Sequence, residues 1–121
     1  MALVLTEEQT MLRDSARDFL RGRAPVSHLR ELRDSGNEDG FSREVWAEMV
    51  EMGWASILIP EEYGGLGFGC SAFMGVVEEI CAACAAFGIM LSVHGSLTCE
   101  ILRLFGSDEL KQKYLPAMAS G

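Results

Sequence analysis

Two cysteines, Cys81 and Cys84, form a CxxC motif, which could serve as a redox dithiol or supply zinc ligands together with His94 and Cys99. A redox CxxC motif lies at the start of a helix, where the helix dipole lowers a thiol pKa, whereas this motif lies inside an alanine-rich stretch that predicts the middle of a helix. A zinc site needs four converging ligands, and the sequence has no second CxxC and no HxxxH pair. We therefore expect buried free thiols that act as small apolar residues, and no metal site.

A glycine-rich stretch, PEEYGGLGFG at residues 60–69, could in principle bind a phosphate. The dinucleotide-binding fingerprint G-x-G-x-x-G needs a third glycine after a parallel strand, but Cys70 stands at that third place after Gly65 and Gly67. The stretch also lacks the Gly-Lys-Ser/Thr end of a phosphate-binding P-loop. We expect a turn that uses glycine for positive φ angles or for close approach of two backbone segments.

Adjacent carboxylates, which could work as a general acid and base, occur at Glu61-Glu62 and at Glu78-Glu79. Neighbouring side chains on a helix point about 100 degrees apart, so the members of each pair cannot converge on one substrate atom. The G-x-S-x-G motif of serine hydrolases is also absent. We therefore predict a solvated acidic surface and no catalytic residue in this chain.

The charge distribution limits the possible partners. The net charge is −8, and residues 34–102 carry eleven acidic side chains against the single basic Arg43. Such a region repels nucleic acid and anionic membranes, so we expect neither as a partner. Four cysteines without a secretory signal predict reduced thiols and a cytoplasmic location.

The longest uncharged stretch, residues 80–99, approaches the roughly 20 residues that a membrane-spanning helix needs. Small and polar residues interrupt it, acidic residues border it, and it has no basic anchors. We therefore favour a buried hairpin of two helices, broken near Gly88, and no transmembrane segment.

Helical spacing of apolar residues runs through most of the chain. A capping box at Thr6-Glu7-Glu8-Gln9 predicts the start of the first helix, and Ser42 and Ser107 are expected caps of later ones. The expected helices span residues 6–21, 27–33, 42–53, 71–87, 89–105 and 107–115, with an extended buried link at residues 54–60 and a stop at Pro116. The predicted fold is all-α, with about six helices in an irregular up-and-down bundle that forms one domain over residues 1–121.

Several segments, in order, resemble the N-terminal helical domain of acyl-CoA dehydrogenases. They are LTEEQ at the first helix, W..M.EMGW before the link, IPEEYGGLGFG, EEI in the next helix and GSDELKQKYLPAMASG at the end. The resemblance covers the whole chain, and the segment IMLSVHGSL looks closest to the short-chain or butyryl-CoA members.

This resemblance implies a flavoprotein oxidoreductase of fatty acid metabolism that uses FAD to desaturate an acyl-CoA between its α and β carbons. In that family an electron-transferring flavoprotein reoxidises the flavin, and the full-length enzyme, a homotetramer, adds a middle β domain and a C-terminal helical domain. Both are absent from these 121 residues, so the resemblance implies a domain that is inactive alone and binds no FAD by itself.

The resemblance also implies a role for one helix face, because family members line the end of the acyl channel from the corresponding helix. The matching residues are Met90, Val93 and Leu97, with His94 beside them. Their bulk favours a short acyl chain. Two alternatives stay open: the face fills the core, with His94 as a hydrogen-bonded core residue, or the chain is a stand-alone helical module that binds a protein partner through a bare apolar face.

Overall fold

The computed structural model describes residues 4–121, and its first helix, α1 (Glu7–Arg23), begins where the sequence predicts. The capping box is formed, because Gln9 N donates to Thr6 Oγ1 at 3.2 Å and Thr6 N donates to Gln9 Oε1 at 3.1 Å. Helix α2 (Val26–Asp34) follows. Helix α3 (Arg43–Glu51) is capped by Ser42, whose Oγ accepts from Val45 N.

The link at residues 54–60 is buried as predicted, but it is not extended. Trp54–Ser56 forms a 3₁₀ turn, and the side chains of Trp54 and Ile57 are completely buried. An extended strand needs a neighbouring strand for its backbone groups. Here those groups bond within the turn and to the glycine-rich stretch: Ile59 N donates to Ser56 O, and Leu66 N donates to Ser56 O. The expectation of an extended link was therefore wrong.

The hairpin breaks at Cys84, not at Gly88. Helix α4 (Cys70–Ala83) ends there, at φ −150° and ψ 105°, and α5 (Ala85–Ser92) follows at once. Gly88 lies inside α5, where a Cβ would stand 2.2 Å from Cys81 Sγ. The glycine thus permits α5 to fold back closely onto α4, and does not interrupt the helix.

A π-helical segment (Val93–Cys99) continues α5 into α6 (Glu100–Phe105), so Ala85 to Phe105 is one long helix. The last helix, α7 (Asp108–Ala119), is capped by Ser107 as predicted. It does not stop at Pro116, which lies inside it. Leu115, completely buried in a cluster with Ile59 and Tyr63, holds this part of α7 against the bundle.

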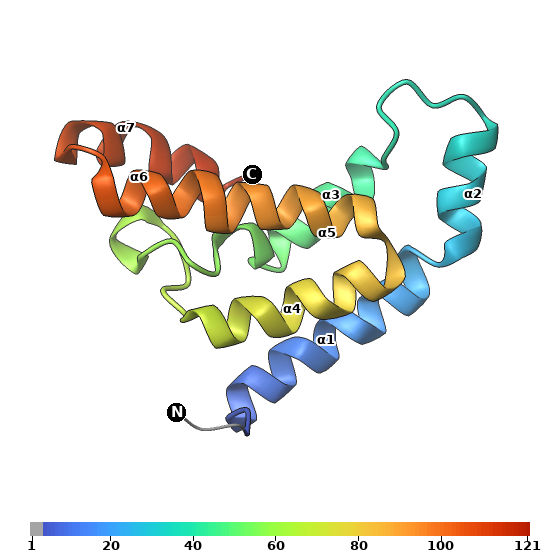
Figure 1. Cartoon of the computed structure of the whole chain (residues 1–121), viewed down its shortest axis with the longest axis horizontal. Helices are drawn as coiled ribbons and strands as arrows, with labels where there is room; N and C mark the ends of the chain where they lie inside the picture. Colours follow the sequence, from blue (N-terminus) through green and yellow to red (C-terminus); the bar gives the residue numbers. More distant parts are fainter. Residues whose placement is uncertain (1–3) are drawn as a thin grey trace.

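The described residues form an all-α fold with no strand, and with six helices when the long helix is counted as one. Figure 1 shows α1 and α4 side by side below the long helix, α7 folded back along its α6 end, and α2 projecting at the opposite end. The main core lies between α1, α3, α4 and α5, and its largest buried side chains include Leu20, Met49, Trp54, Ile80 and Phe87. The predicted irregular bundle is confirmed.

Candidate functional site

The glycine-rich loop after Pro60 is a turn, and it has few free backbone donors. Gly64 and Gly67 have φ angles of +83° and +64°, and a Cβ on Gly65 would lie 2.0 Å from Ile59 O. The amides of residues 64–68 all donate to backbone carbonyls between residues 56 and 61. Because these amides are already used, the loop cannot surround a phosphate, and the prediction of a turn is confirmed.

The four cysteines are free thiols, but only Cys84 and Cys99 are buried, whereas Cys70 and Cys81 are exposed. Burial, with a smaller contribution from the charge of Glu100, raises the pKa of the Cys99 thiol to about 11. Among residues 4–121 no three His, Cys, Asp or Glu side chains gather as metal ligands would. The expectation of buried thiols is thus right for two cysteines and wrong for Cys81.

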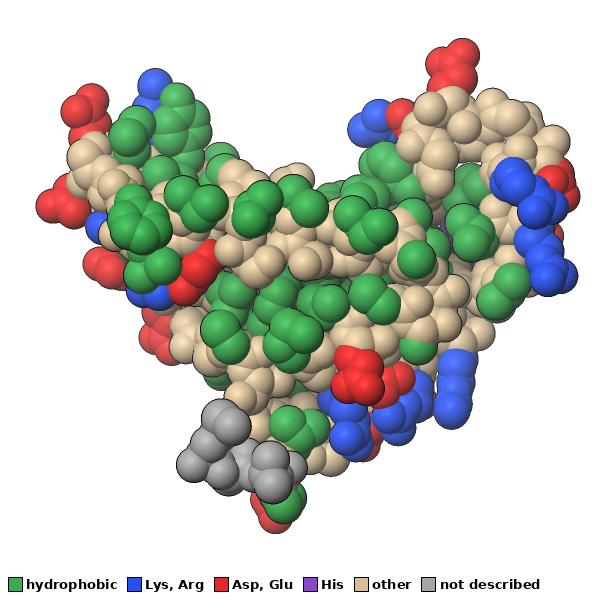
Figure 2. Space-filling view, in the orientation of Figure 1, with side chains coloured by type: hydrophobic (Ala, Val, Ile, Leu, Met, Phe, Trp, Pro, Cys, Tyr) green, Lys and Arg blue, Asp and Glu red, His purple; other side chains and the backbone are tan. Residues whose placement is uncertain are grey.

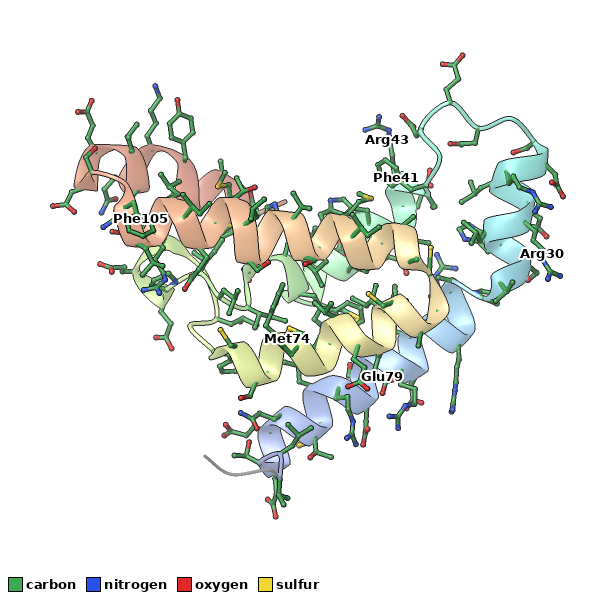
Figure 3. The ribbon with its side chains drawn as sticks, viewed as in Figure 1. Arg30, Phe41, Arg43, Met74, Glu79 and Phe105 are labelled. Atoms are coloured by element: carbon green, nitrogen blue, oxygen red, sulfur yellow. The ribbon has the colours of Figure 1, made fainter. Side chains whose placement is uncertain are left out.

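Glu61 and Glu62 are both exposed, and the members of the Glu78–Glu79 pair diverge as expected. Glu78 is exposed, whereas Glu79 turns toward α1, where its Oε2 accepts from Arg17 Nε at 3.0 Å (Figure 3). The second guanidinium nitrogen of Arg17 donates to the other oxygen of Glu79, and this hydrogen bonding lowers the pKa of the Glu79 carboxyl. A carboxylate held by arginine is a poor proton acceptor, so Glu79 ties two helices together and has no feature of a general base.

Three of the four predicted substrate-facing residues come together, and the fourth does not. Met90, Val93 and His94 line one open hollow of about 590 Å³, whereas Leu97 lines a neighbouring hollow of about 460 Å³. Thr98 borders both hollows. In a regular α-helix, residues 90, 93, 94 and 97 would lie on one face. The π segment begins at Val93, and its wider turn rotates Leu97 away from the side that carries Met90 and His94.

His94 is half-buried and its ring is held on two sides. Its Nε2 lies 3.0 Å from Met118 O, to which it donates, and the indole of Trp46 meets it edge-on with ring centroids 6.2 Å apart. The interpretation of His94 as a hydrogen-bonded residue of the bundle therefore has direct support. Its remaining surface lines the 590 Å³ hollow.

The sequence reasoning missed several side chains on the same surface. Trp46 reaches the first hollow from α3, and Ile89 lines it beside Met90. Ile101 and Phe105 line the second hollow, and Phe105 is 81% exposed. Figure 2 shows this row of hydrophobic side chains along the long helix. Four-residue spacing from Ile89 to Phe105 could have revealed most of the row, but nothing local in the sequence points to Trp46.

The same helix meets the length and composition criteria for a membrane span. It has 21 residues, and its most apolar 18-residue stretch has a mean hydropathy of 1.4, with 28% of that stretch buried. The predicted burial of this hairpin is therefore only partial. One side of the helix packs on α4, while the other remains an apolar surface.

Comparisons with known proteins agree on one family. The family described as "Acyl-CoA dehydrogenase, N-terminal domain" matches residues 6–121. An acyl-CoA dehydrogenase of Bacillus subtilis is 36% identical over 118 residues, which are 97% of this chain and 30% of the relative.

Two solved structures share the fold. Butyryl-CoA dehydrogenase from Megasphaera elsdenii has a TM-score of 0.86 and 25% identity, covering 99% of this chain and 31% of that one. The acyl-CoA dehydrogenase of Bacillus anthracis, solved in complex with FAD, has a TM-score of 0.82 and 28% identity, covering 96% of this chain and 19% of that one. The chain thus spans less than a third of the length of these relatives. Its fold and its sequence from Thr6 onward show that the chain belongs to the acyl-CoA dehydrogenase N-terminal domain family.

Proposed function

We propose that this chain serves as the N-terminal helical domain of an FAD-dependent acyl-CoA dehydrogenase that desaturates a short-chain acyl-CoA between its α and β carbons. In this proposal the chain supplies part of the acyl pocket and the interfaces to the other domains. It is inactive alone, because the catalytic base and most of the flavin contacts belong to parts of the enzyme outside these 121 residues.

The observation that carries this proposal is the exposed apolar face of the long helix. Five large side chains on it are each about half exposed or more: Ile89, Val93, Leu97, Ile101 and Phe105. A contiguous apolar face of this kind is rare on a soluble monomer unless a partner covers it. The relatives are about three times as long as this chain, so the rest of such an enzyme is the partner that we assign to this face.

Acyl binding is assigned to the hollow beside Met90, Val93 and His94. Its lining is mainly apolar, and His94 and Thr98 are the polar residues in it. A pocket of mostly apolar lining with few polar groups suits an alkyl chain. The similarity to butyryl-CoA dehydrogenase supports a short chain, with Leu97 acting from the adjacent hollow.

The flavin is assigned elsewhere in the enzyme. FAD carries a pyrophosphate, and the glycine-rich loop does not fit it, because its amides are bonded to backbone carbonyls. The acidic middle of the chain supplies only Arg43, which Asp39 already pairs. We further propose, at the level of the family, a cytoplasmic homotetramer whose flavin is reoxidised by an electron-transferring flavoprotein.

The test compares the chain alone with the chain joined to the remainder of the Bacillus subtilis relative, in place of its matching part. We expect no flavin absorption band from the chain alone, and a flavin band that bleaches with butyryl-CoA from the joined protein. Tight FAD binding by the chain alone would overturn the assignment of the flavin. Dimerisation of the chain through the apolar face, with an inactive joined protein, would favour a stand-alone interaction module.

A further inference from the structure

The π segment is the most unusual part of the long helix. Glu100 N donates to Gly95 O, five residues back, as the π-helical pattern requires, and the same N–H is shared with Leu97 O, three residues back. The Thr98 hydroxyl donates to Val93 O at 3.0 Å, also five residues back. In an α-helix a threonine hydroxyl reaches the carbonyl three or four residues back, so this bond depends on the wider turn.

The wider turn has a consequence for the exposed apolar side chains. These residues, Ile89, Val93, Leu97, Ile101 and Phe105, follow one another at intervals of four. In an α-helix each interval of four exceeds one turn by about 40 degrees, so four intervals would carry Phe105 about 160 degrees away from Ile89. A π turn takes more residues, so within Val93–Cys99 an interval of four falls short of a full turn. The intervals at the two ends stay α-helical, and the total drift from Ile89 to Phe105 is reduced from about 160 to about 50 degrees.

We propose that the π segment is a positioning device that keeps these five side chains in one straight ridge, and that Gly95 and Thr98 are the residues that hold it. The use of the ridge rests on the proposed function, in which it faces the acyl pocket and the rest of the enzyme. The register of the helix, however, is a property of this chain alone.

Gly95 fixes the position of the segment over α4. A Cβ on this residue would lie 2.8 Å from two ring atoms of Phe73, which is itself buried. Contacts this short force either the ring or the helix to move. Only glycine lets the π segment lie this close to α4, and the close packing in turn holds the ridge on the opposite, exposed side.

Thr98 fixes the register from within the helix. Its hydroxyl donates to Val93 O, a carbonyl that an α-helical turn would place out of reach. Ser96 offers an internal comparison, because its hydroxyl donates to Ser92 O at 2.7 Å, four residues back, as in an ordinary α-helix. The Thr98 bond therefore favours the π register, and the Ser96 bond does not.

The experiment measures scalar couplings across hydrogen bonds by NMR in the 121-residue chain. In the unmodified chain we expect the amide of residue 100 to couple to the carbonyl of Gly95. In Thr98→Val, which keeps the shape and removes the hydroxyl, we expect loss of that coupling and a new coupling to residue 96. Thr98→Ser and Ser96→Ala are the matched controls, and both are expected to retain the coupling to Gly95.

Gly95→Ala is expected to lose the same coupling, and the added substitution Phe73→Leu, which makes room, is expected to restore it. A soluble paramagnetic probe gives the second readout: the methyl groups of Ile89 and Ile101 relax together in the unmodified chain and diverge in Thr98→Val. Retention of the coupling in Thr98→Val, with unchanged methyl relaxation, overturns the inference. If Gly95→Ala does not fold, the Thr98 variants decide alone, and all these readouts are independent of whether the enzyme desaturates acyl-CoA.

Discussion

At the residue scale, the property of this chain that bears on ligand binding is the shape of its exposed apolar side chains. Three of the groups that could react are otherwise engaged: Glu79 is bonded to Arg17, His94 Nε2 is bonded to Met118 O, and Cys99 is buried. In the proposed function the acyl chain binds in the hollow around Met90 and Val93. Its specificity should therefore depend on volume and not on charge.

Val93 offers a direct test of that dependence. Its side chain is 48% exposed, so Val93→Trp can fill the hollow without disturbing the core. In the joined enzyme we expect kcat/KM for octanoyl-CoA to fall by at least about tenfold relative to that for butyryl-CoA, because the longer chain needs the filled space. Steady-state kinetics with both substrates measures the ratio. Val26→Trp, at a similarly exposed position on α2, is the control, and an equal ratio in both variants would refute acyl binding at this hollow.

Gly65 tests the close approach in the glycine-rich turn. A Cβ there would meet Ile59 O at 2.0 Å, so Gly65→Ala must displace backbone, and we expect the free energy of unfolding to fall by about 2 kcal/mol or more. Urea denaturation measures it. Gly22→Ala is the control, because Gly22 lies within α1 with nothing within 4 Å, and alanine there should stabilise the helix by up to about 1 kcal/mol.

At the element scale, the bundle depends on pairs of helices that meet closely. Helix α1 packs along α4, and the Arg17–Glu79 ion pair joins them at the surface beside the core residues Ala16 and Leu20. Figure 3 shows Glu79 between the two helices. Since Arg17 is 37% exposed, water screens the pair and limits its contribution to stability.

Glu79→Gln should therefore cost about 1 kcal/mol of unfolding free energy at pH 7. The Arg17 hydrogen bond lowers the pKa of Glu79 below its ordinary value of 4.5, so the stabilisation is present above that value and is lost as the pH falls through the lowered pKa. Urea unfolding from pH 7 to pH 3 should show the two proteins converging. Asp34→Asn, in the exposed Arg33–Asp34 pair, is expected to change stability by less than about 0.5 kcal/mol throughout. A constant gap for Glu79→Gln would refute the assignment.

The elements themselves were largely predictable, and the errors have a common cause. Caps at Thr6, Ser42 and Ser107 are local hydrogen bonds, so the sequence located the helix starts well. The break at Cys84 and the passage of α7 through Pro116 depend on what packs against them. Glycine and proline have local preferences that suggest breaks, but close contact with α4 in one case and burial of a neighbour in the other outweighed those preferences.

At the scale of the whole molecule, the distribution of apolar surface is uneven. One side of the long helix covers the core, while the other carries the ridge in the open. Figure 2 shows charged side chains gathered around α1, around α2 and at the α7 end, with few along the middle of the long helix. Covering such a surface is favourable, because each Å² of apolar area removed from water lowers the free energy by roughly 25 cal/mol.

Two substitutions on the ridge test what covers it. Leu97 and Ile101 are 57% and 52% exposed, so changing both to Asp should alter the unfolding free energy of the chain by less than about 0.5 kcal/mol each. In the joined enzyme the same changes should abolish flavin retention and activity, because two carboxylates would be buried at the domain interface. Thermal unfolding and flavin absorbance are the measurements. Met11→Asp, at a 71% exposed position on α1, is the control, and full activity of the double variant would contradict the proposed interface.

The sequence by itself determined the all-α class, most helix starts, the glycine turn and the family resemblance, because helical spacing, caps and turn residues act over a few positions. Only the tertiary structure decided the 3₁₀ turn at Trp54, the hairpin bend at Cys84 and the π segment. It also decided that Met90, Val93 and His94 share a hollow with Trp46, while Leu97 belongs to the next. These features depend on contacts between residues far apart in the chain, such as Gly95 with Phe73 and His94 with Met118, and a local pattern carries no information about such contacts.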